Sequence, residues 1–435
     1  MFKTLGSAFK NKDLRKSILM TLLFLLIYRL GCYLPVPGLN AEIYSSAIAS
    51  ESGTGILSLL NSITGSALAN GAFFALGVTP YINASIIVQL LTFGIPALER
   101  LSKRGDEGKQ KINLITKIVA LVLAVAQGVG IVLGYKDSVA PIFGENLMWL
   151  SSIFVVITLI AGASLTMWIG DRITEQGVGN GLSLIIFVGI ISTAGLSLVN
   201  SIGSIFKGDT NAIWELLGFL AMAFVIFALI VFFDLAERKI PVQYAKQVKG
   251  RKMYGGQSTH IPLKINANGV LPIIFATAII TFPNLIMQLC GVTRESSGFA
   301  RFYYDYIGAG GAIYSVLVGL LILFFSYFYA QIQFNPTDVS LNIQQQGGFI
   351  PGIRPGKPTT EYLSKVSKRI TLFGAIFLAF IAIVPSIIFR YIAGGSLSLI
   401  NAFTATGMLI VVSVAIEFNT QLEAQLMAKR HKNIL

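Results

Sequence analysis

The sequence predicts an all-α membrane protein with ten transmembrane helices. Of its 435 residues, 54% are apolar and only 12% are charged, and a soluble protein of this size could not bury that much apolar surface. The apolar residues form ten stretches of about 20 residues, each long enough to cross roughly 30 Å of hydrocarbon as a helix. These stretches lie near residues 18–36, 73–94, 114–134, 148–169, 181–203, 213–233, 269–290, 311–333, 370–389 and 399–416.

The basic residues are distributed unequally between the two sides of the membrane that these spans define. All but six of the 33 Lys and Arg residues fall on the same side as the two termini. The exceptions are Lys136, Lys207, Arg294, Arg301 and Arg390, together with Arg29 inside the first span. Since Lys and Arg accumulate in cytoplasmic loops, we expect both termini to be cytosolic, which requires an even number of spans.

The composition also limits the chemistry that we expect. Cys32 and Cys290 have no CxxC spacing, and His260 and His431 are the only histidines, so a metal site or histidine-based catalysis is not expected. There is no GxxxxGK[ST] motif, and we expect no cofactor and no enzyme. The net charge of +13 indicates membrane topology and anionic lipid before nucleic acid, for which ribosomal RNA is the one serious candidate.

Residues 55–71 differ from the spans around them. Apolar side chains recur at helical spacing from Ile56 to Ala67 and polar ones occupy the other face, which predicts a helix near 56–70 that is too short and too polar to span. Gly71 separates it from the span expected to begin near residue 73. A half-helix at membrane depth must be covered by protein or line a cavity. The alternative is an amphipathic helix lying on the outer face.

Charged side chains are nearly absent from the spans. Arg29 lies near the outer end of the first span, where we expect it to snorkel or to pair with loop groups rather than to bind a substrate. Asp and Glu occur only at span ends and in loops. Ion-coupled transporters usually carry buried ionisable groups, so this distribution weighs against that class.

Two cytosolic loops, 234–266 and 334–369, are too polar and too rich in Gly and Pro to be simple connectors. In the first, two alternating stretches flank a Gly-rich turn with Arg251 and Lys252, which predicts a protruding hairpin. The second places Arg354 between two Pro-Gly steps. A fixed arginine on a long ordered loop is typical of a docking surface for a large partner.

At these residues the chain resembles the bacterial SecY family, the central subunits of the protein-conducting channel (translocon). The resemblance extends to PYINASIIVQLLT (80–92), GVGNGLSLIIF (177–187), QSTHIPLKIN (257–266) and FNPT (334–337). These motifs follow one another in the family's order along the whole chain. The resemblance implies a passive channel that translocates secretory polypeptides across the bacterial cytoplasmic membrane, and that releases membrane-protein helices laterally into it.

The resemblance also implies a clam-shell of two inverted five-helix halves. The N-terminal half would be residues 1–203, the C-terminal half residues 213–435, and the hinge residues 204–212. Spans two and three would face spans seven and eight across a lateral gate, and the helix at 56–70 would be the plug. Two halves with five spans each must have opposite orientations, which agrees with the charge distribution.

Site residues follow from the same resemblance, matched position by position. The pore would be closed by an aliphatic ring of Val78, Ile82, Leu182, Ile186, Ile274 and Ile410. The plug residues would be Ile56, Leu59, Leu60, Asn61 and Ile63, the lateral-gate residues Ser85, Gln127 and Asn284, and the cytosolic docking residues Arg251, Lys252 and Arg354. An apolar ring excludes ions by dewetting and offers a passing peptide no hydrogen bond. The alternatives are ordinary packing or lipid contact for the ring, and bonds to their own helix backbone for the gate residues.

The expected partners also come from the resemblance. The family implies SecE, and usually SecG, as companion subunits, and the ribosome or the SecA motor ATPase as cytosolic partners. Basic side chains suit both rRNA phosphates and acidic protein patches. The alternative function is an inverted-repeat secondary transporter of a small solute, which would explain ten spans and a discontinuous helix but not two long basic loops.

Overall fold

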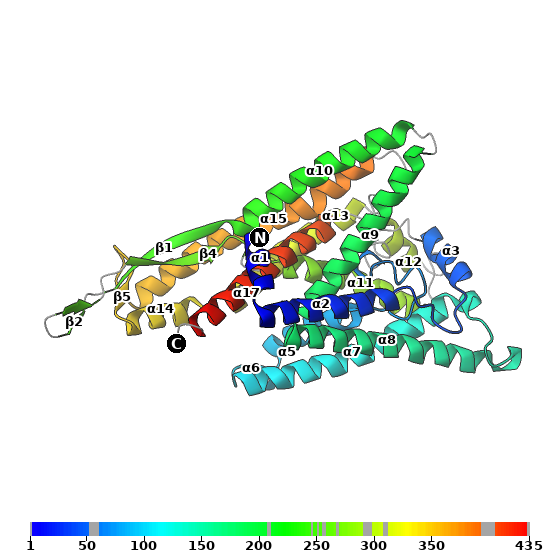
Figure 1. Cartoon of the computed structure of the whole chain (residues 1–435), viewed down its shortest axis with the longest axis horizontal. Coiled ribbons are helices and arrows are strands. Elements are labelled where there is room, and N and C mark those ends of the chain that lie inside the picture. Colours follow the sequence, from blue (N-terminus) through cyan, green and yellow to red (C-terminus); the bar gives the residue numbers. More distant parts are fainter. Residues whose placement is uncertain are drawn as a thin grey trace. The chain divides into compact units, whose positions relative to one another are not determined.

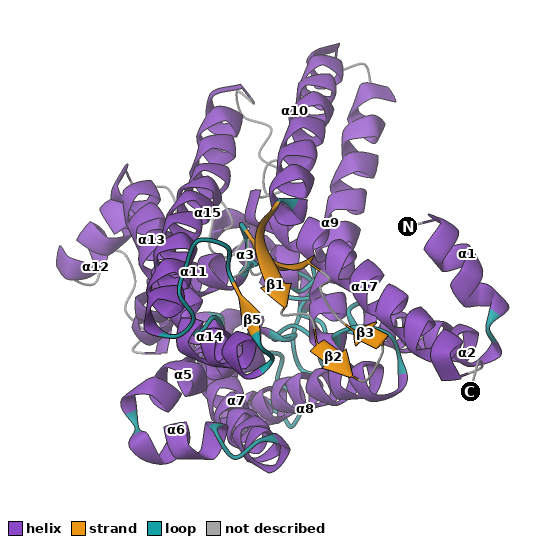
Figure 2. Cartoon of the chain, turned by 90° about the vertical axis from the view of Figure 1, so that its left-hand side faces the viewer, coloured by secondary structure: helices purple, strands orange, loops and turns teal. Residues whose placement is uncertain are grey.

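The computed structural model describes residues 2–51, 61–206, 210–244, 247–249, 252–254, 258–266, 269–289, 298–307, 312–392 and 405–432. Helices dominate these residues (Figure 1). The strands in the described part of the chain are short and lie within residues 237–264 and at 348–349 (Figure 2).

The chain divides into two compact units. The first consists of residues 1–220, 278–314 and 389–435, and the second of residues 221–277 and 315–388. The predicted halves meet at residues 204–212, of which 207–209 lie outside the described residues. That division therefore stays a prediction.

The first unit is a helical bundle with an irregular segment inside it. Its helices are α1 (Phe2–Lys10), α2 (Lys12–Gly31), α3 (Ala41–Glu51), α5 (Thr79–Gly94), α6 (Pro96–Ser102), α7 (Asp106–Gly134), α8 (Met148–Gln176), α9 (Gly181–Phe206), α12 (Gly298–Phe302) and α17 (Ala405–Lys432). Helix α7 contacts α5 and α8, while α9 contacts α2, α8 and α17. Most of these helices begin where the sequence supplies a suitable first turn, such as Pro80 in α5 and the acidic pair Asp106 and Glu107 in α7.

Glycines allow close contact inside the first unit. A Cβ added to Gly162 of α8 would lie 1.9 Å from the carbonyl oxygen of Phe73, and one added to Gly181 of α9 would lie 2.0 Å from that of Gly170. Small residues at helix contacts are typical of membrane bundles, where dispersion and not water exclusion drives association. An ion pair between Lys117 and Asp171, 2.6 Å from nitrogen to oxygen, also joins α7 to α8.

The second unit combines helices with a small sheet. Its elements are most of α10 (Thr210–Leu235), the start of α11 (Leu271–Leu289), α13 (Ala312–Gln333), α14 (Pro336–Gln345), α15 (Lys357–Ile392), β1 (Glu237–Tyr244), β4 (Ser258–Lys264) and β5 (Gly348–Phe349). The strand order is β4-β1-β5, and β1 pairs antiparallel with β4 so that Ile240 lies opposite Ile261. The two strands β2 (Gln247–Lys249) and β3 (Lys252–Tyr254) form a separate ribbon at the tip. The predicted hairpin is thus confirmed.

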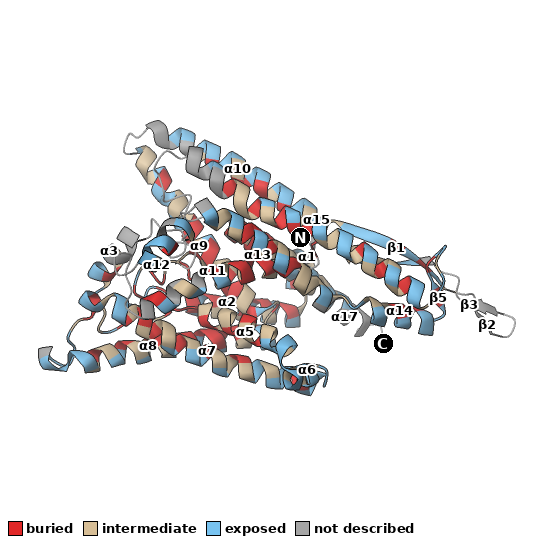
Figure 3. Cartoon of the chain, turned by 180° about the vertical axis from the view of Figure 1, so that it is seen from behind, coloured by how far each residue is buried: buried red, intermediate tan, exposed pale blue. Residues whose placement is uncertain are grey.

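Seven described helices are long and apolar enough to cross a membrane, and an eighth candidate is the pair α5 and α6, bent by 106°. The other two predicted spans coincide with α2, whose first turns carry several charged residues, and with α11, which contains a shorter apolar helix at Leu271–Ile280. Each of the ten predicted stretches therefore overlaps a described helix. Large apolar side chains are exposed on these helices, including Trp214, Phe224 and Phe232. Figure 3 shows buried and exposed residues alternating along the helices.

The start of the second span was predicted wrongly. Helix α5 begins at Thr79 and not near residue 73. Residues 71–73 instead pair with 34–36: the Val36 amide donates to the Gly71 carbonyl at 3.0 Å, and the Phe73 amide donates to the Leu34 carbonyl at 2.7 Å. Positive φ angles at Gly71 (56°) and Gly77 (51°) keep the intervening chain out of a helix.

We expect Gly162→Ala to lower the free energy of unfolding by about 1–3 kcal/mol, because the new methyl group would collide with backbone and not with a flexible side chain. Thermal unfolding in detergent measures the effect. Gly195→Ala is the matched control, since Gly195 lies in α9 and has open space around its Cα. Equal melting temperatures for the two variants would contradict this account of the α8 contact.

Candidate functional site

The irregular segment at residues 61–78 is the most unusual part of the first unit. Asn61–Ile63 form the end of a helical turn, after which Gly65 and Ser66 adopt positive φ angles of 67° and 69°. Asn61 organises the turn: its backbone carbonyl accepts from the Ser66 amide at 2.9 Å, and its side-chain oxygen accepts from the Ala69 amide at 3.0 Å. The positive φ angle of Ser66 is unfavourable, since residues other than glycine rarely adopt the left-handed region.

Side chains from α2 and α9 donate hydrogen bonds to carbonyl groups of this turn. The Tyr28 hydroxyl donates to the Thr64 carbonyl at 3.4 Å, and Arg29 Nη1 donates to the Gly65 carbonyl at 3.2 Å. From the other side, the Thr193 hydroxyl donates to the Ser62 carbonyl at 3.4 Å. Backbone outside a helix can lie at membrane depth only when its polar groups are satisfied within the protein, and here three side chains do so.

Aromatic and glycine contacts hold the same segment closely. The rings of Tyr28 and Phe74 stack with centroids 5.4 Å apart. A Cβ on Gly189 of α9 would lie 2.4 Å from the carbonyl oxygen of Ile63. Helix α9 therefore approaches the segment so closely that it has no room for a side chain at this position.

Of the predicted plug residues, Asn61 and Ile63 are described, whereas Ile56, Leu59 and Leu60 lie outside the described residues. Ser62, Thr64, Ala67 and Leu68 are buried in the first unit. The C-terminal part of the predicted helix is thus enclosed by protein, and does not lie exposed on the outer face. Its role as a plug stays a prediction.

The predicted pore ring is distributed over three helices of the first unit and one of the second. Val78 lies at the cap of α5, Ile82 in its first turn, Leu182 and Ile186 in the first turns of α9, and Ile410 on α17. Leu182 packs against Gly170 of α8, because a Cβ on Gly170 would lie 2.5 Å from Leu182 Cδ2. Ile274 lies on α11 in the second unit. The closed ring therefore stays a prediction.

The predicted lateral-gate residues lie on α5, α7 and α11. Ser85 has a partner on its own helix, since Gln89 Nε2 donates to Ser85 Oγ at 3.4 Å. Gln127 is half-buried on α7, and the backbone of Asn284 follows Pro283 inside α11, while its side chain lies outside the described part. The partner of Ser85 is a side chain, and not the helix backbone that the alternative names. The role of the three residues in a gate stays a prediction.

The described parts of the two polar loops, 234–266 and 334–369, form one module with its own core in the second unit. Ile240 and Val242 of β1 pack with side chains from the other loop and from α15, namely Ile343, Ile350, Leu363 and Val366. Strand β5 extends the sheet by pairing with the end of β1. The base is tied to α10, since Asn266 Nδ2 donates to Asp234 Oδ1 at 2.6 Å. The apolar contacts make the two loops a single folded body.

Arg354 lies on a tightly bonded turn of this module. Gly352 and Gly356 on either side have φ angles of 82° and 96°, which only glycine adopts without strain. The Thr359 hydroxyl donates to the Arg354 carbonyl at 2.9 Å, and the Ser340 hydroxyl donates to the Gly356 carbonyl at 3.1 Å. The backbone is therefore fixed while the Arg354 side chain is exposed.

The other two predicted docking residues are less completely described. Lys252 lies in β3 and pairs in register with Lys249 of β2. Arg251 lies outside the described residues. The place of Lys252 at the end of this ribbon agrees with the predicted turn.

Part of the positive charge of the segment at 99–117 is compensated locally. Lys103 and Lys111 each approach a carboxylate four residues earlier, Glu99 and Glu107, at 2.6 Å. These hydrogen bonds and charges lower the pKa of both carboxyl groups below the ordinary value. The segment thus presents less net positive charge at neutral pH than its count of basic residues indicates.

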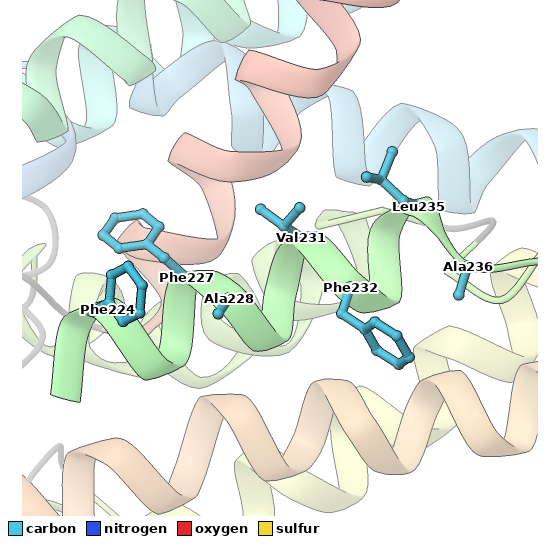
Figure 4. A pocket seen from close by; sticks show the side chains of 7 residues that line it. All are labelled: Phe224, Phe227, Ala228, Val231, Phe232, Leu235 and Ala236. Atoms are coloured by element: carbon cyan, nitrogen blue, oxygen red, sulfur yellow. The ribbon is translucent and has the colours of Figure 1, made fainter. Parts of the chain in front are cut away.

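An apolar groove of about 650 Å³ follows one side of α10. Figure 4 shows its lining side chains, Phe224, Phe227, Ala228, Val231, Phe232, Leu235 and Ala236. None of them offers a polar group to a solute. A groove of this kind suits lipid or an apolar helix.

Several residues of the site were not predicted from the sequence. Tyr28, Ser192 and Thr193 have polar groups near the irregular segment, but nothing in their spacing indicates which carbonyl each one binds. Gln89 was part of the quoted PYINASIIVQLLT motif, and its buried Oε1 has no hydrogen-bond partner within the described residues. A glutamine among mostly apolar residues of the second half of this span was the signal that could have identified it.

Comparisons with known proteins agree over the whole chain. A protein-family model described as SecY matches residues 72–419. The chain is 40% identical over 449 residues to the protein translocase subunit SecY of Streptomyces galbus, with 100% of both chains covered. It is 39% identical over 441 residues to the protein translocase subunit SecY of Thermus thermophilus, with 100% of this chain and 98% of the relative covered.

Solved channel structures share the fold. One is described as showing that the plug domain of the SecY protein stabilises the closed state of the translocation channel. It has a TM-score of 0.70 and 19% identity, and the match covers 96% of this chain and 94% of that chain. Sec61 in the canine ribosome–channel complex has a TM-score of 0.65 and 17% identity, with the same coverage. The predicted all-α fold is confirmed by this likeness.

We expect Thr359→Val to loosen the turn that carries Arg354, because it removes the donor to the Arg354 carbonyl without changing side-chain volume much. A net hydrogen-bond contribution of about 0.5–1.5 kcal/mol corresponds to amide exchange roughly 3- to 10-fold faster. Hydrogen exchange of residues 350–356 measures it. Thr360→Val is the control, since its hydroxyl reaches only the Gly356 carbonyl at 3.5 Å. Unchanged exchange in both variants would show that the glycines alone fix the turn.

Proposed function

Because this chain belongs to the SecY family, we propose that it is the pore-forming subunit of a bacterial protein translocase. It would conduct secretory polypeptides across the cytoplasmic membrane and release membrane-protein helices laterally into lipid. The observation that carries the proposal is the full-length match to protein translocase subunits. The chain would act as a passive channel, and its partners would supply the energy for translocation of the polypeptide.

In this proposal the pore is closed by the aliphatic ring of Val78, Ile82, Leu182, Ile186, Ile274 and Ile410. The pairs 78/82 and 182/186 are each four residues apart, and so lie on one side of the chain as it enters α5 and α9. A narrow apolar ring excludes ions because water and ions leave it, yet it offers a peptide no hydrogen bond that would hold it. Sealing and low friction therefore come from the same side chains.

The plug and the lateral gate complete the closed state. The plug would be the helix at 56–70, whose enclosed C-terminal part is bonded to α2 and α9. Ser85, Gln127 and Asn284 would stabilise the gate by about 0.6–2 kcal/mol each. Because the Ser85 contact is shared with Gln89 on the same helix, we place the smallest contribution there.

The module containing Arg354 would bind the cytosolic partners, with Arg251 and Lys252 at the hairpin tip. The ribosome is supported as a partner by the likeness to Sec61 in a ribosome–channel complex. SecA, SecE and SecG are proposed from family membership alone. An exposed guanidinium on a fixed turn suits rRNA phosphate or an acidic protein surface.

We further propose that both termini are cytosolic and that residues 204–212 form the hinge between two inverted halves. The charge distribution supports this orientation. A secondary transporter of a small solute is not favoured, since the full-length relatives are translocase subunits and the groove along α10 has no polar lining.

A cysteine at Ile82, in a variant without Cys32 and Cys290, should crosslink to a stalled secretory chain, because the chain would pass through the aliphatic ring. We expect the crosslink only when the chain carries a functional signal sequence. Gly94→Cys, at the cytosolic end of the same helix, is the position control. If Ile82→Cys gives no crosslink with folded protein and all partners present, the solute transporter becomes the better hypothesis.

Arg354→Glu should abolish translocation while the protein still inserts into the membrane, because the change reverses the charge at the proposed docking turn. We expect a loss of at least about 10-fold in secretion rate, as for truncation of a charged contact at an interface centre. Lys357→Glu, three residues further and also exposed, makes the same charge change outside the turn. Normal secretion by Arg354→Glu would refute the assignment.

A further inference from the structure

Arg29 has no role in the proposed function so far, although it is a charged residue within an apolar helix. It lies in the last turn of α2, beside the buried residues Tyr28 and Cys32. Its side chain is half-buried and makes contacts with groups outside its own helix. A charge held at this place calls for an explanation.

Both ends of the guanidinium are bonded to other elements of the first unit. Nη1 donates to the Gly65 carbonyl at 3.2 Å, and Nη2 donates to the Ser192 hydroxyl of α9. The charge also lies over the ring of Tyr33, 5.6 Å from its centroid. Arg29 therefore joins α2, α9 and the irregular segment at residues 61–78.

The turn at Gly65 is shaped around the guanidinium. A Cβ at this position would lie 2.2 Å from Arg29 Nη1 and 3.0 Å from Gly189 Cα of α9. With its φ of 67°, Gly65 can present its carbonyl to the arginine while its Cα fits between the two. A snorkelling side chain needs no such fitted partner, so the geometry favours a specific contact.

The partners of Arg29 are neutral oxygens and an aromatic ring, and no carboxylate pairs with it among the described residues. Charge-assisted hydrogen bonds to neutral acceptors are stronger than neutral ones. A salt bridge would leave a second buried charge when it opened. Contacts of this kind can therefore hold the segment firmly and still be released, because the guanidinium is the only charged group of the contact that must then be hydrated.

We infer that Arg29 is a latch that holds the base of the plug, residues 61–66, against α2 and α9 while the channel is closed. The inference rests on the proposed function, and it makes Arg29 a positioning residue for gating. The hydrogen bonds of Arg29 would break when the plug leaves, so the strength of these bonds would determine how readily a signal sequence opens the channel. Loss of a charge-assisted hydrogen bond shifts a two-state equilibrium by about 10- to 100-fold.

Cys32 supplies a direct readout of the latch. It is buried beneath the segment, with Sγ 3.8 Å from the Thr64 carbonyl. In a Cys290→Ser background it is the only cysteine of the chain. Its labelling by a membrane-impermeant thiol reagent added from the outer side would report release of the segment.

We expect Arg29→Gln to raise the labelling rate of Cys32 about 10-fold or more, and to raise the ion conductance of the resting protein in planar bilayers. Arg29→Lys should give a smaller effect, because one ammonium cannot reach both partners with a planar fork. Arg172→Gln is the matched control. Arg172 also bonds a side chain, that of Glu175, and lies over an aromatic ring, that of Trp168, but it lies far along α8 from the segment. It should leave labelling and conductance unchanged.

Ser192→Ala keeps the arginine and removes one of its partners, so it tests the latch even if Arg29→Gln fails to fold. We expect labelling several-fold faster than in the parent. Labelling no faster than in Arg172→Gln for both folded variants would overturn the latch. Faster labelling in a protein that never conducts and gives no Ile82→Cys crosslink would support the contact but reject the channel, so the two failures are distinguishable.

Discussion

Polar backbone at membrane depth must find its hydrogen bonds inside the protein, and the first unit is organised around that constraint. The chain leaves the helical conformation after Ile63 and returns to it at Thr79. Its exposed carbonyl groups would each cost several kcal/mol in hydrocarbon. Side chains of α2 and α9 bind those at the turn, and pairing with residues 34–36 satisfies those that follow. The arrangement of α2, α9 and α5 follows from these bonds.

Two kinds of contact hold the irregular segment at residues 61–78. Glycine fixes it where backbone meets backbone, since a Cβ on Gly189 of α9 would lie 2.4 Å from the Ile63 carbonyl oxygen. Hydrogen bonds from Tyr28, Arg29 and Thr193 hold the turn, and each of these bonds can exchange for water. The hydrogen bonds are the part of this attachment that the proposed plug would have to break.

The sequence predicted the helices well because their signal is local. Apolar runs of about 20 residues and alternating charge need no knowledge of distant contacts, and the alternation in 236–266 predicted the β1–β4 hairpin in the same way. The boundary at Thr79 could not be predicted, since it depends on pairing with residues 34–36. Arg29 was expected to snorkel or to pair with loop groups, and it pairs; its partners are 36 and 163 residues away in the chain. Only the fold brings them together.

Contacts within the loop module connect the turn of Arg354 to helix α10. Strand β1 follows α10 after a single residue, and the Ile265 amide donates to the Ala236 carbonyl at 3.0 Å where β4 ends. The bond from Asn266 to Asp234 lies at the same junction. The core that contains Leu363 then joins the hairpin to α15, which bears the turn of Arg354 at its start. Because the hairpin and α15 share one apolar core, a displacement of the Arg354 turn is transmitted to α10 through packed side chains and not through a flexible linker.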